Sequence, residues 1–248
     1  MITIEKPVTL DGGEIELGRL TMESDAIGLV EVSVFANIAI DRKTPVPVSN
    51  IKPAEIIEEL GTQEFPEILK STPGIYATKQ GGAFGDSRVN IRGFNARNSA
   101  VMINGVPVND MENGWVYWSN WAGLSDVTRT MQVQRGLGAA KIALPSVGGT
   151  INILTKTTDA ERGGSVNYGI GNDGYNKLGV TLSSGLTENN WATTVSLSKT
   201  AGDGYVDGTQ FDSYSYYLNV SKIVNDDHRL ALSLFGAPQW HGQRRTEL

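Results

Sequence analysis

Residues 165–171 read SVNYGIG, and this short stretch sets the pattern of the C-terminal third of the chain. Val166, Tyr168 and Ile170 alternate with Asn167 and two glycines, so large apolar side chains fall on one face of an extended strand. Small and polar residues fall on the other face. A period of two is the sequence sign of a β-strand whose two faces meet different surroundings.

Four later segments repeat this alternation, and their polar faces carry mainly Ser, Thr, Asn and Gly with few charges. Such a face suits a wet lumen, and the apolar face then meets lipid. The tight turns TENN and NDD and the long connection TAGDGYVDGTQFD have the two-sided asymmetry of membrane barrels. The four segments are KLGVTLSSG (177–185), WATTVSLSK (191–199), SYYLNVSK (215–222) and RLALSLFG (229–236). Aromatic residues near the strand ends are expected at the membrane–water interface: Tyr168, Trp191, Tyr214 and Trp240.

Five strands are too few to close a membrane barrel, because about eight is the minimum. An open edge in lipid would leave backbone groups unpaired. The N-terminal sequence MITIEKPVTLDGG also lacks the basic and apolar regions of a secretory signal. We therefore expect this chain to be a fragment of a longer protein, with a truncated transmembrane β-barrel of antiparallel strands.

The region before these strands has mixed α+β character. PAEIIEEL, beginning at Pro53, has proline and acids in its first turn, and FPEILKST ends before Pro73; both predict short helices. Short strands divided by Gly and Asn follow. About 105 residues of this kind predict one small α+β domain.

The segments EFPEILKSTPGI, RVNIRGF, MINGVPV, VQRGLGAA and GGTINILTK occur in this order between about Pro53 and Lys156. Together they resemble the plug domain of TonB-dependent outer-membrane receptors. The later segments DGYVDGT, SYYLNVSK and FGAPQWHGQR are similar to the first barrel strands of that family. The resemblance divides the chain into the tail of a carboxypeptidase-regulatory-like β domain (1–28), a linker (29–52), the plug (53–158) and the first barrel strands (159–248).

The resemblance implies a receptor in the cell outer membrane, with the plug inside a barrel of roughly 22 strands and the N-terminal part in the periplasm. It implies transport rather than an enzymatic reaction, with no catalytic residue and no cofactor. The expected partners are TonB, outer-membrane lipid, an extracellular ligand and a surface lipoprotein. Iron chelates, cobalamin, oligosaccharides and peptides all enter through such receptors, and the N-terminal extension favours a glycan or a peptide.

Receptors of this family carry a TonB box before the plug, which pairs with TonB as an added β-strand. Our candidate is Glu31, Val32, Ser33 and Val34. The alternative is an ordinary linker strand.

Arg92 in IRG and Arg135 in QRG match plug arginines that meet barrel carboxylates in the family. The planar fork of arginine suits such a plug–barrel latch. Their partners are expected mostly beyond Leu248. The alternative is two surface arginines beside turn glycines.

The segment NDMENGWVYWSNW (109–121), called the aromatic segment below, concentrates tryptophans among polar residues. Aromatic faces can bind sugars or peptide side chains, and the amides and carboxylates can orient them. The alternative is a core role, and the spacing of Trp118 and Trp121 would place both on one face of a helical turn. The ligand-contact candidates are Asn113, Trp115, Tyr117 and Trp118.

Other chemistries find little support. The formal charge of −6 argues against a basic nucleic-acid binder, and the chain has no cysteine and two distant histidines, so no metal cluster is visible. GIGNDG (169–174) is followed by a strand rather than the helix that nucleotide binding requires. Asp110, Glu112 and Asp126 lack a regular calcium-ligand spacing.

Two rival functions remain. The first is a soluble secreted β-sandwich that binds carbohydrate through the aromatic segment. The second is a glycoside hydrolase, which would need two carboxylates beside a cleft, with Asp110 and Glu112 as the pair to test.

Overall fold

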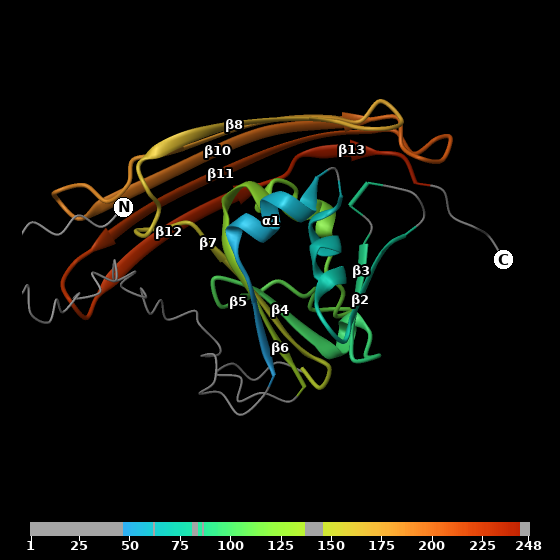
Figure 1. Cartoon of the computed structure of the whole chain (residues 1–248), viewed down its shortest axis with the longest axis horizontal. Helices are drawn as coiled ribbons and strands as arrows, with labels where there is room; N and C mark the ends of the chain where they lie inside the picture. Colours follow the sequence, from blue (N-terminus) through green and yellow to red (C-terminus); the bar gives the residue numbers. More distant parts are fainter. Residues whose placement is uncertain (1–46, 62, 81–83, 86, 137–145, 244–248) are drawn as a thin grey trace, which may run out of the picture. The chain divides into compact units, whose positions relative to one another are not determined.

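The computed structural model describes residues 47–61, 63–80, 84–85, 87–136 and 146–243. Within these residues the chain folds as an α+β domain followed by an antiparallel sheet (Figure 1). The predicted fold class is confirmed. The predicted TonB box and residues 1–28 lie outside the described residues.

A mixed five-stranded sheet forms the centre of the α+β domain, in the order β1-β6-β7-β4-β5. β4 pairs parallel with β7, and the other neighbours pair antiparallel. β1 belongs to this sheet, although its residues were predicted to be part of the linker. The strands are β1 (Val48–Ile51), β4 (Ser99–Ile103), β5 (Val106–Pro107), β6 (Thr128–Arg135) and β7 (Gly149–Thr155).

Short helices and one hairpin cover this sheet, and the two predicted helices are both present. Helix α1 begins with a proline at its first turn and a capping contact from the Lys52 backbone N–H to Glu55 Oε2 (3.0 Å). The second predicted helix is a 3₁₀ helix that ends at Ser71, because the residue before Pro73 is held extended. The elements are α1 (Pro53–Leu60), η1 (Phe65–Ser71), β2 (Ile75–Lys79), β3 (Ser87–Ile91), η2 (Ala96–Asn98), η3 (Trp118–Trp121) and α2 (Leu124–Val127).

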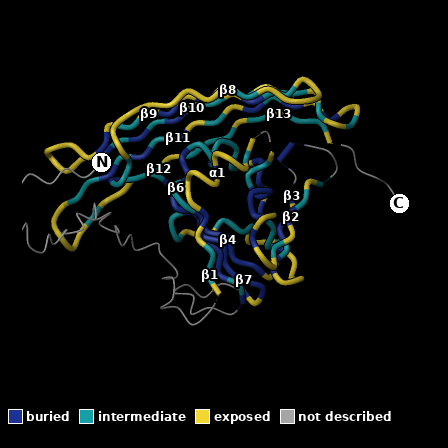
Figure 2. The backbone as a smooth tube through the Cα atoms, in the orientation of Figure 1, coloured by how far each residue is buried: buried dark blue, intermediate teal, exposed yellow. Residues whose placement is uncertain are grey.

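The core of the α+β domain lies between the five-stranded sheet and these elements, where the tube in Figure 2 is dark blue. Ile151 and Ile153 on β7, Met131 and Val133 on β6, and Leu69 on η1 are all fully buried. At roughly 1.5–3 kcal/mol for each such side chain, this burial is the main favourable term for the fold of this domain.

The second sheet contains strands that follow one another in sequence and in space, in the order β12-β11-β10-β9-β8. Each of the five predicted segments overlaps one of these strands, and those at 165–171 and 177–185 extend one and two residues past the strand ends. A short sixth strand, β13, pairs with the beginning of β11. The strands are β8 (Gly163–Ile170), β9 (Asn176–Ser183), β10 (Trp191–Gly202), β11 (Phe211–Ile223), β12 (Arg229–Gly236) and β13 (Gln239–His241).

Burial in this sheet is the reverse of that in a soluble domain, because polar residues are buried and large apolar residues are exposed. The buried polar residues face the α+β domain and include Thr181, Thr194, Ser196, Asn219 and Ser221. The opposite face is apolar and open: Val166, Tyr168, Ile170, Leu178, Val180, Leu182, Leu197, Leu230, Leu232 and Leu234.

Aromatic residues border this apolar face at both ends, as predicted. Trp191 lies at one end of β10, and the Nζ atom of Lys222 lies 4.9 Å from the centre of its ring. Towards the other end of β10, Lys199 pairs with Tyr214 of β11, and its Nζ atom lies 4.9 Å from the centre of the Tyr214 ring. Trp191 and Lys199 are separated along β10 by about 27 Å at a strand rise of ~3.4 Å per residue. A strand tilt of about 40° reduces this to roughly 20 Å, close to the apolar band of membrane barrels.

Among the described residues, none of the helices has the length and apolar character needed to cross a membrane.

Candidate functional site

A buried ion pair joins the α+β domain to the inner face of the second sheet. Lys177 Nζ on β9 lies 2.7 Å from Asp126 Oδ1 on α2, and both side chains are largely shielded from water. The second carboxylate oxygen of Asp126 is buried without a hydrogen-bond partner among the described residues. The ammonium of Lys177 therefore supplies the main compensation for this buried carboxylate.

Hydrogen bonds and aromatic contacts extend the junction across β11 and β12. Tyr217 on β11 donates from its hydroxyl to Thr155 Oγ1 (3.0 Å) and the Lys156 carbonyl (3.1 Å). Trp121 meets the edge of the Phe235 ring on β12, with ring centres 5.8 Å apart. These contacts fix the end of β7 and the aromatic segment against the second sheet, which is called the wall below.

Gly123 brings the backbone of the α+β domain closest to the wall. It has a φ of 77° and faces Ser215 Oγ so closely that a Cβ atom would overlap with it. Ser215 shares a hydrogen bond with Ser198 (2.6 Å). The glycine is therefore required both by its left-handed backbone and by the space available.

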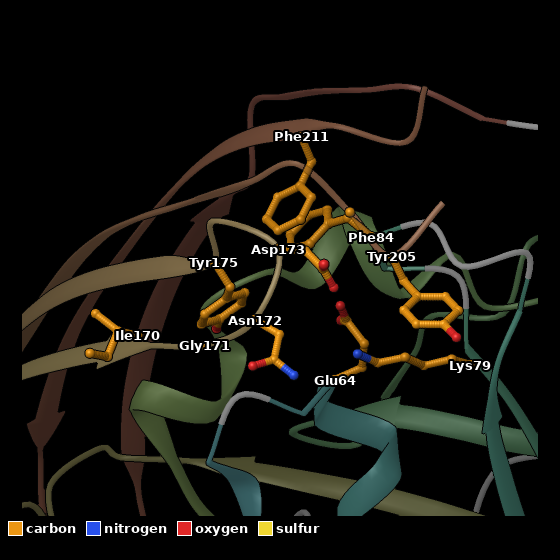
Figure 3. A pocket seen from close by; sticks show the side chains of 11 residues that line it. Glu64, Lys79, Phe84, Ile170, Gly171, Asn172, Asp173, Tyr175, Tyr205 and Phe211 are labelled. Carbon is orange, nitrogen blue, oxygen red and sulfur yellow. The ribbon is translucent and has the colours of Figure 1, made fainter. Parts of the chain in front are cut away.

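A cavity of about 500 Å³ opens at one end of the junction. Figure 3 shows its lining, with Glu64, Lys79 and Phe84 from the α+β domain and Tyr175 and Phe211 from the sheet and its loops. The rings of Phe84 and Phe211 stack with centres 4.6 Å apart and planes 11° apart. The cavity combines an aromatic wall with carboxylates, an ammonium and an amide, which suits a polar organic ligand.

Tyr175 is a weak acid in this cavity. Burial raises the pKa of its hydroxyl to about 12, and the nearby carboxylates of Glu64 and Asp126 add to the effect because they disfavour a phenolate. Tyr175 therefore stays a neutral hydrogen-bonding group at every physiological pH.

Side-chain caps hold the aromatic segment in a compact loop. Asn109 accepts from the Val101 N–H (2.8 Å) and donates to the carbonyls of Ser99 and Gly114 (both 3.0 Å), which fixes the loop to β4. Asp110 accepts from the backbone N–H groups of Glu112 (3.0 Å) and Asn113 (2.9 Å). This capping role accounts for Asp110 without a catalytic or calcium-binding function.

Three of the four predicted ligand-contact residues lie together on the loop surface. The Asn113 side chain accepts from the Trp115 N–H (2.8 Å) and donates to the Tyr117 hydroxyl (2.8 Å). Tyr117 is 50% exposed and Trp115 is half-buried. The guanidinium groups of Arg88 and Arg97 both lie over the Trp115 ring, an arrangement that was not predicted from the sequence.

Trp118, the fourth predicted contact, is part of the core and is 6% exposed. Its ring meets that of Phe65 edge to face, with centres 6.4 Å apart. The core interpretation of the Trp118–Trp121 pair thus describes Trp118 fully and Trp121 in part, because Trp121 is partly buried against the same core and also meets Phe235 of β12. We leave Trp118 out of the proposed ligand surface.

The side chains of the two predicted latch arginines both lie close to Gly74. Arg135 donates to the Pro73 carbonyl (2.9 Å) and to Ser49 Oγ (3.3 Å), while Arg92 is exposed and has a positive φ of 54°. Among the described residues, neither arginine forms an ion pair with a carboxylate. The described residues do contain an ion pair between the plug and the second sheet, Lys177–Asp126. It was not predicted because nothing in either local sequence marks the other residue as its partner.

The described residues contain no group of three or more His, Cys, Asp or Glu side chains placed to hold a metal ion.

Comparisons with known proteins agree with this architecture. Residues 41–150 match the family model described as "TonB-dependent Receptor Plug Domain". The α+β domain is therefore a TonB-dependent receptor plug domain, followed in the same chain by the antiparallel strands of a wall.

Two curated relatives show how far the similarity extends. A "Vitamin B12 transporter BtuB" of Photobacterium profundum is 28% identical over 233 residues, covering 88% of this chain and 38% of the relative. A "Ferric enterobactin receptor" of Pseudomonas aeruginosa is 29% identical over 168 residues, covering 63% of this chain and 21% of the relative. The chain thus spans well under half the length of these relatives.

Solved structures show the same fold. The siderophore receptor PiuA from Acinetobacter baumannii matches with a TM-score of 0.60 and 24% identity, over 81% of this chain and 27% of that one. The pyoverdine outer membrane receptor FpvA from Pseudomonas aeruginosa matches with a TM-score of 0.63 and 20% identity, over 77% and 27%.

Proposed function

We propose that this chain is part of a TonB-dependent receptor that imports a ligand across the outer membrane. The observation that carries the proposal is a plug domain packed on the polar face of a sheet whose opposite face is apolar and bordered by aromatic residues. In the proposed mechanism the plug blocks the lumen, a ligand binds from outside, and TonB then remodels the plug. No covalent chemistry is involved, so the protein is a transporter and not an enzyme.

Location provides the first test of this proposal. The receptor should fractionate with outer membranes and need detergent for extraction, because its apolar face would otherwise meet water. A protein that stays monomeric and soluble without detergent would instead favour the carbohydrate-binding β-sandwich.

We infer that Glu31–Val34 is the TonB box and pairs with TonB as an added strand. The support is its apolar, strand-prone sequence before the plug. Proline at position 34 should abolish this pairing, because it removes a backbone N–H donor. The measurement is binding of the purified full chain to the periplasmic domain of TonB, with V34T as the matched control. Equal binding by V34P and V34T would leave residues 31–34 as an ordinary linker strand.

Arg92 and Arg135 are proposed as a latch between the plug and carboxylates of the wall. Their proximity around Gly74 supports a shared role. Lysine at either position keeps the charge but loses the planar fork, so R92K or R135K should weaken retention of the plug in the intact receptor. Protease accessibility of the plug would measure this, and accessibility unchanged in both variants would end the proposal.

The substrate is proposed to be a glycan or a peptide. The sequence of residues 1–28, the exposed ring of Tyr117 and the half-buried ring of Trp115 support this class. The relatives named for vitamin B12 and ferric enterobactin provide the comparison ligands. A receptor that binds either of these and neither glycans nor peptides would contradict the proposed class.

A further inference from the structure

Two arginines and one tryptophan form an anion-binding platform on the plug surface, here called the Arg88–Trp115–Arg97 platform. The guanidinium carbon of Arg88 lies 4.8 Å from the centre of the Trp115 ring, and that of Arg97 lies 5.0 Å from it. Three separate parts of the chain supply these residues: strand β3, the helix η2 and the aromatic segment. Such convergence in space is not visible from spacing in the sequence.

The platform has an uncompensated positive charge. Both guanidinium groups lie about 5 Å from one ring centre, so they are separated by at most about 10 Å, one Debye length at 0.1 M salt. Both arginine residues are exposed, and among the described residues neither forms an ion pair. Two like charges are thus held near each other on a chain whose formal charge is −6.

The neighbouring acids do not neutralise the platform. The Asp110 carboxylate accepts two backbone N–H groups within its own loop, and Glu112 is exposed without an ion pair to either arginine among the described residues. The indole ring contacts both guanidinium groups through cation–π interactions, which leaves N–H groups available to donate hydrogen bonds to a ligand.

The supports of the platform are rigid. Arg88 pairs with Thr78 in the β2–β3 hairpin, and the Arg97 backbone N–H donates to the capping Asn95 side chain (3.1 Å). The Trp115 backbone is held at both ends, by Asn113 Oδ1 (2.8 Å) and through its carbonyl by the Asp110 N–H (2.7 Å). Preorganised charged donors lower the entropy cost of capturing a ligand.

We propose that the Arg88–Trp115–Arg97 platform binds a carboxylate group of the imported ligand. This inference rests on the proposed transport function and narrows its substrate to carboxylate-bearing molecules. Guanidinium forks match the planar carboxylate through paired hydrogen bonds. The carboxylate could belong to a peptide C-terminus or to a uronic acid in a glycan, and the experiment separates these two sources.

Binding of four probes to the full chain in detergent, measured by titration calorimetry, tests the proposal. The probes are a neutral hexapeptide with a free C-terminus, its C-terminal amide, trigalacturonate and its methyl ester. We expect one carboxylate probe to bind and its amide or ester to bind at least about 10-fold more weakly, as expected for loss of charge-assisted hydrogen bonds. Preference for the peptide or for the uronate identifies the source.

Variants assign the binding to the platform. R88Q and R97Q should each lower the affinity for the carboxylate probe about 10-fold or more. R88K and R97K should retain part of that affinity, because lysine keeps the charge. R162Q removes an exposed arginine elsewhere and should have no effect. Unchanged thermal midpoints show that the variants fold.

Three results would overturn the proposal: no binding of either carboxylate probe at millimolar concentration, equal binding of the blocked probes, or unchanged affinity in R88Q and R97Q. Binding of TonB is measured on the same preparations, so that a failure of the carboxylate site can be distinguished from a failure of the proposed transport function. If the chain bound a carboxylate probe but did not bind TonB, the result would contradict the proposed transport function and still support the carboxylate site.

Discussion

At the scale of single residues, the polarity of the second sheet is the reverse of what water would select. Thr194 and Asn219 are 0% exposed, whereas Val166 and Leu230 are 71% and 65% exposed. Buried polar groups need hydrogen bonds, and the sheet supplies them locally: Asn219 donates to Ser233 Oγ (2.9 Å). The exposed apolar face therefore suits contact with lipid, and the buried polar face suits contact with the plug.

Substitution of Gly123 by alanine should loosen the plug from the wall. A left-handed φ costs a non-glycine residue about 1–2 kcal/mol, and the overlap with Ser215 adds a packing penalty of roughly 1–3 kcal/mol. G93A is the matched control, because Gly93 also has a positive φ but has open space around it. Thermal unfolding in detergent should show a larger loss for G123A. Equal losses would mean that the backbone conformation alone matters.

The hydroxyl of Tyr175 should lose its proton at a higher pH than an ordinary tyrosine. Its folded-state pKa of about 12 lies above the ordinary value of 10.0, so the folded chain keeps its proton while the unfolded chain loses it. Stability from this residue is therefore complete below pH 10 and falls as the pH rises from 10 towards 12. Ultraviolet difference titration against Y175F measures the pKa.

E64Q should lower the pKa of Tyr175 only partly, because burial is the larger cause. A wild-type tyrosine that titrates near pH 10 at this position would contradict the described environment.

At the scale of elements, the junction between plug and wall depends on α2 and β9. Neutralising one member of the Lys177–Asp126 pair leaves the other charge buried without compensation, a loss of about 3–5 kcal/mol. We therefore expect K177M and D126N each to destabilise the chain more than the double variant K177M/D126N does. A double-mutant cycle from unfolding measurements checks this order, and additive single effects would show that the two side chains act independently.

Elements of regular pattern could be predicted from the sequence, while contacts between them could not. The alternation in RLALSLFG and the proline at the start of PAEIIEEL each specify a local structure that the chain adopts. The Arg88–Trp115–Arg97 platform needs three distant segments to fold first, and the burial of Trp118 depends on Phe65. Aromatic composition alone therefore could not distinguish Trp118, which is buried in the core, from the more accessible Asn113, Trp115 and Tyr117 of the same loop.

At the scale of the whole molecule, the outer face of the sheet forms one apolar band between two aromatic borders. Arginine at a lipid-facing position costs about 2–4 kcal/mol at the bilayer midplane and about 0–1 near the interface. L234R should therefore destabilise the membrane-inserted protein far more than L230R. Leu230 pairs with Lys222 at the border, whereas Leu234 pairs with Leu218 inside the band. Unfolding from lipid vesicles measures both variants, and similar losses would place the band elsewhere.

The position of β1 has a mechanical consequence. β1 is an edge strand that pairs with β6 alone, through four residues from Val48 to Ile51. Tension applied to the chain ahead of Val48 reaches this strand before any other part of the plug sheet. The hydrogen bonds between β6 and β7 and between β7 and β4 do not involve β1, so they remain when β1 detaches. A small extension of the chain is then enough to open one side of the plug. We therefore expect β1 to detach at a lower force than the strands at the centre of the sheet.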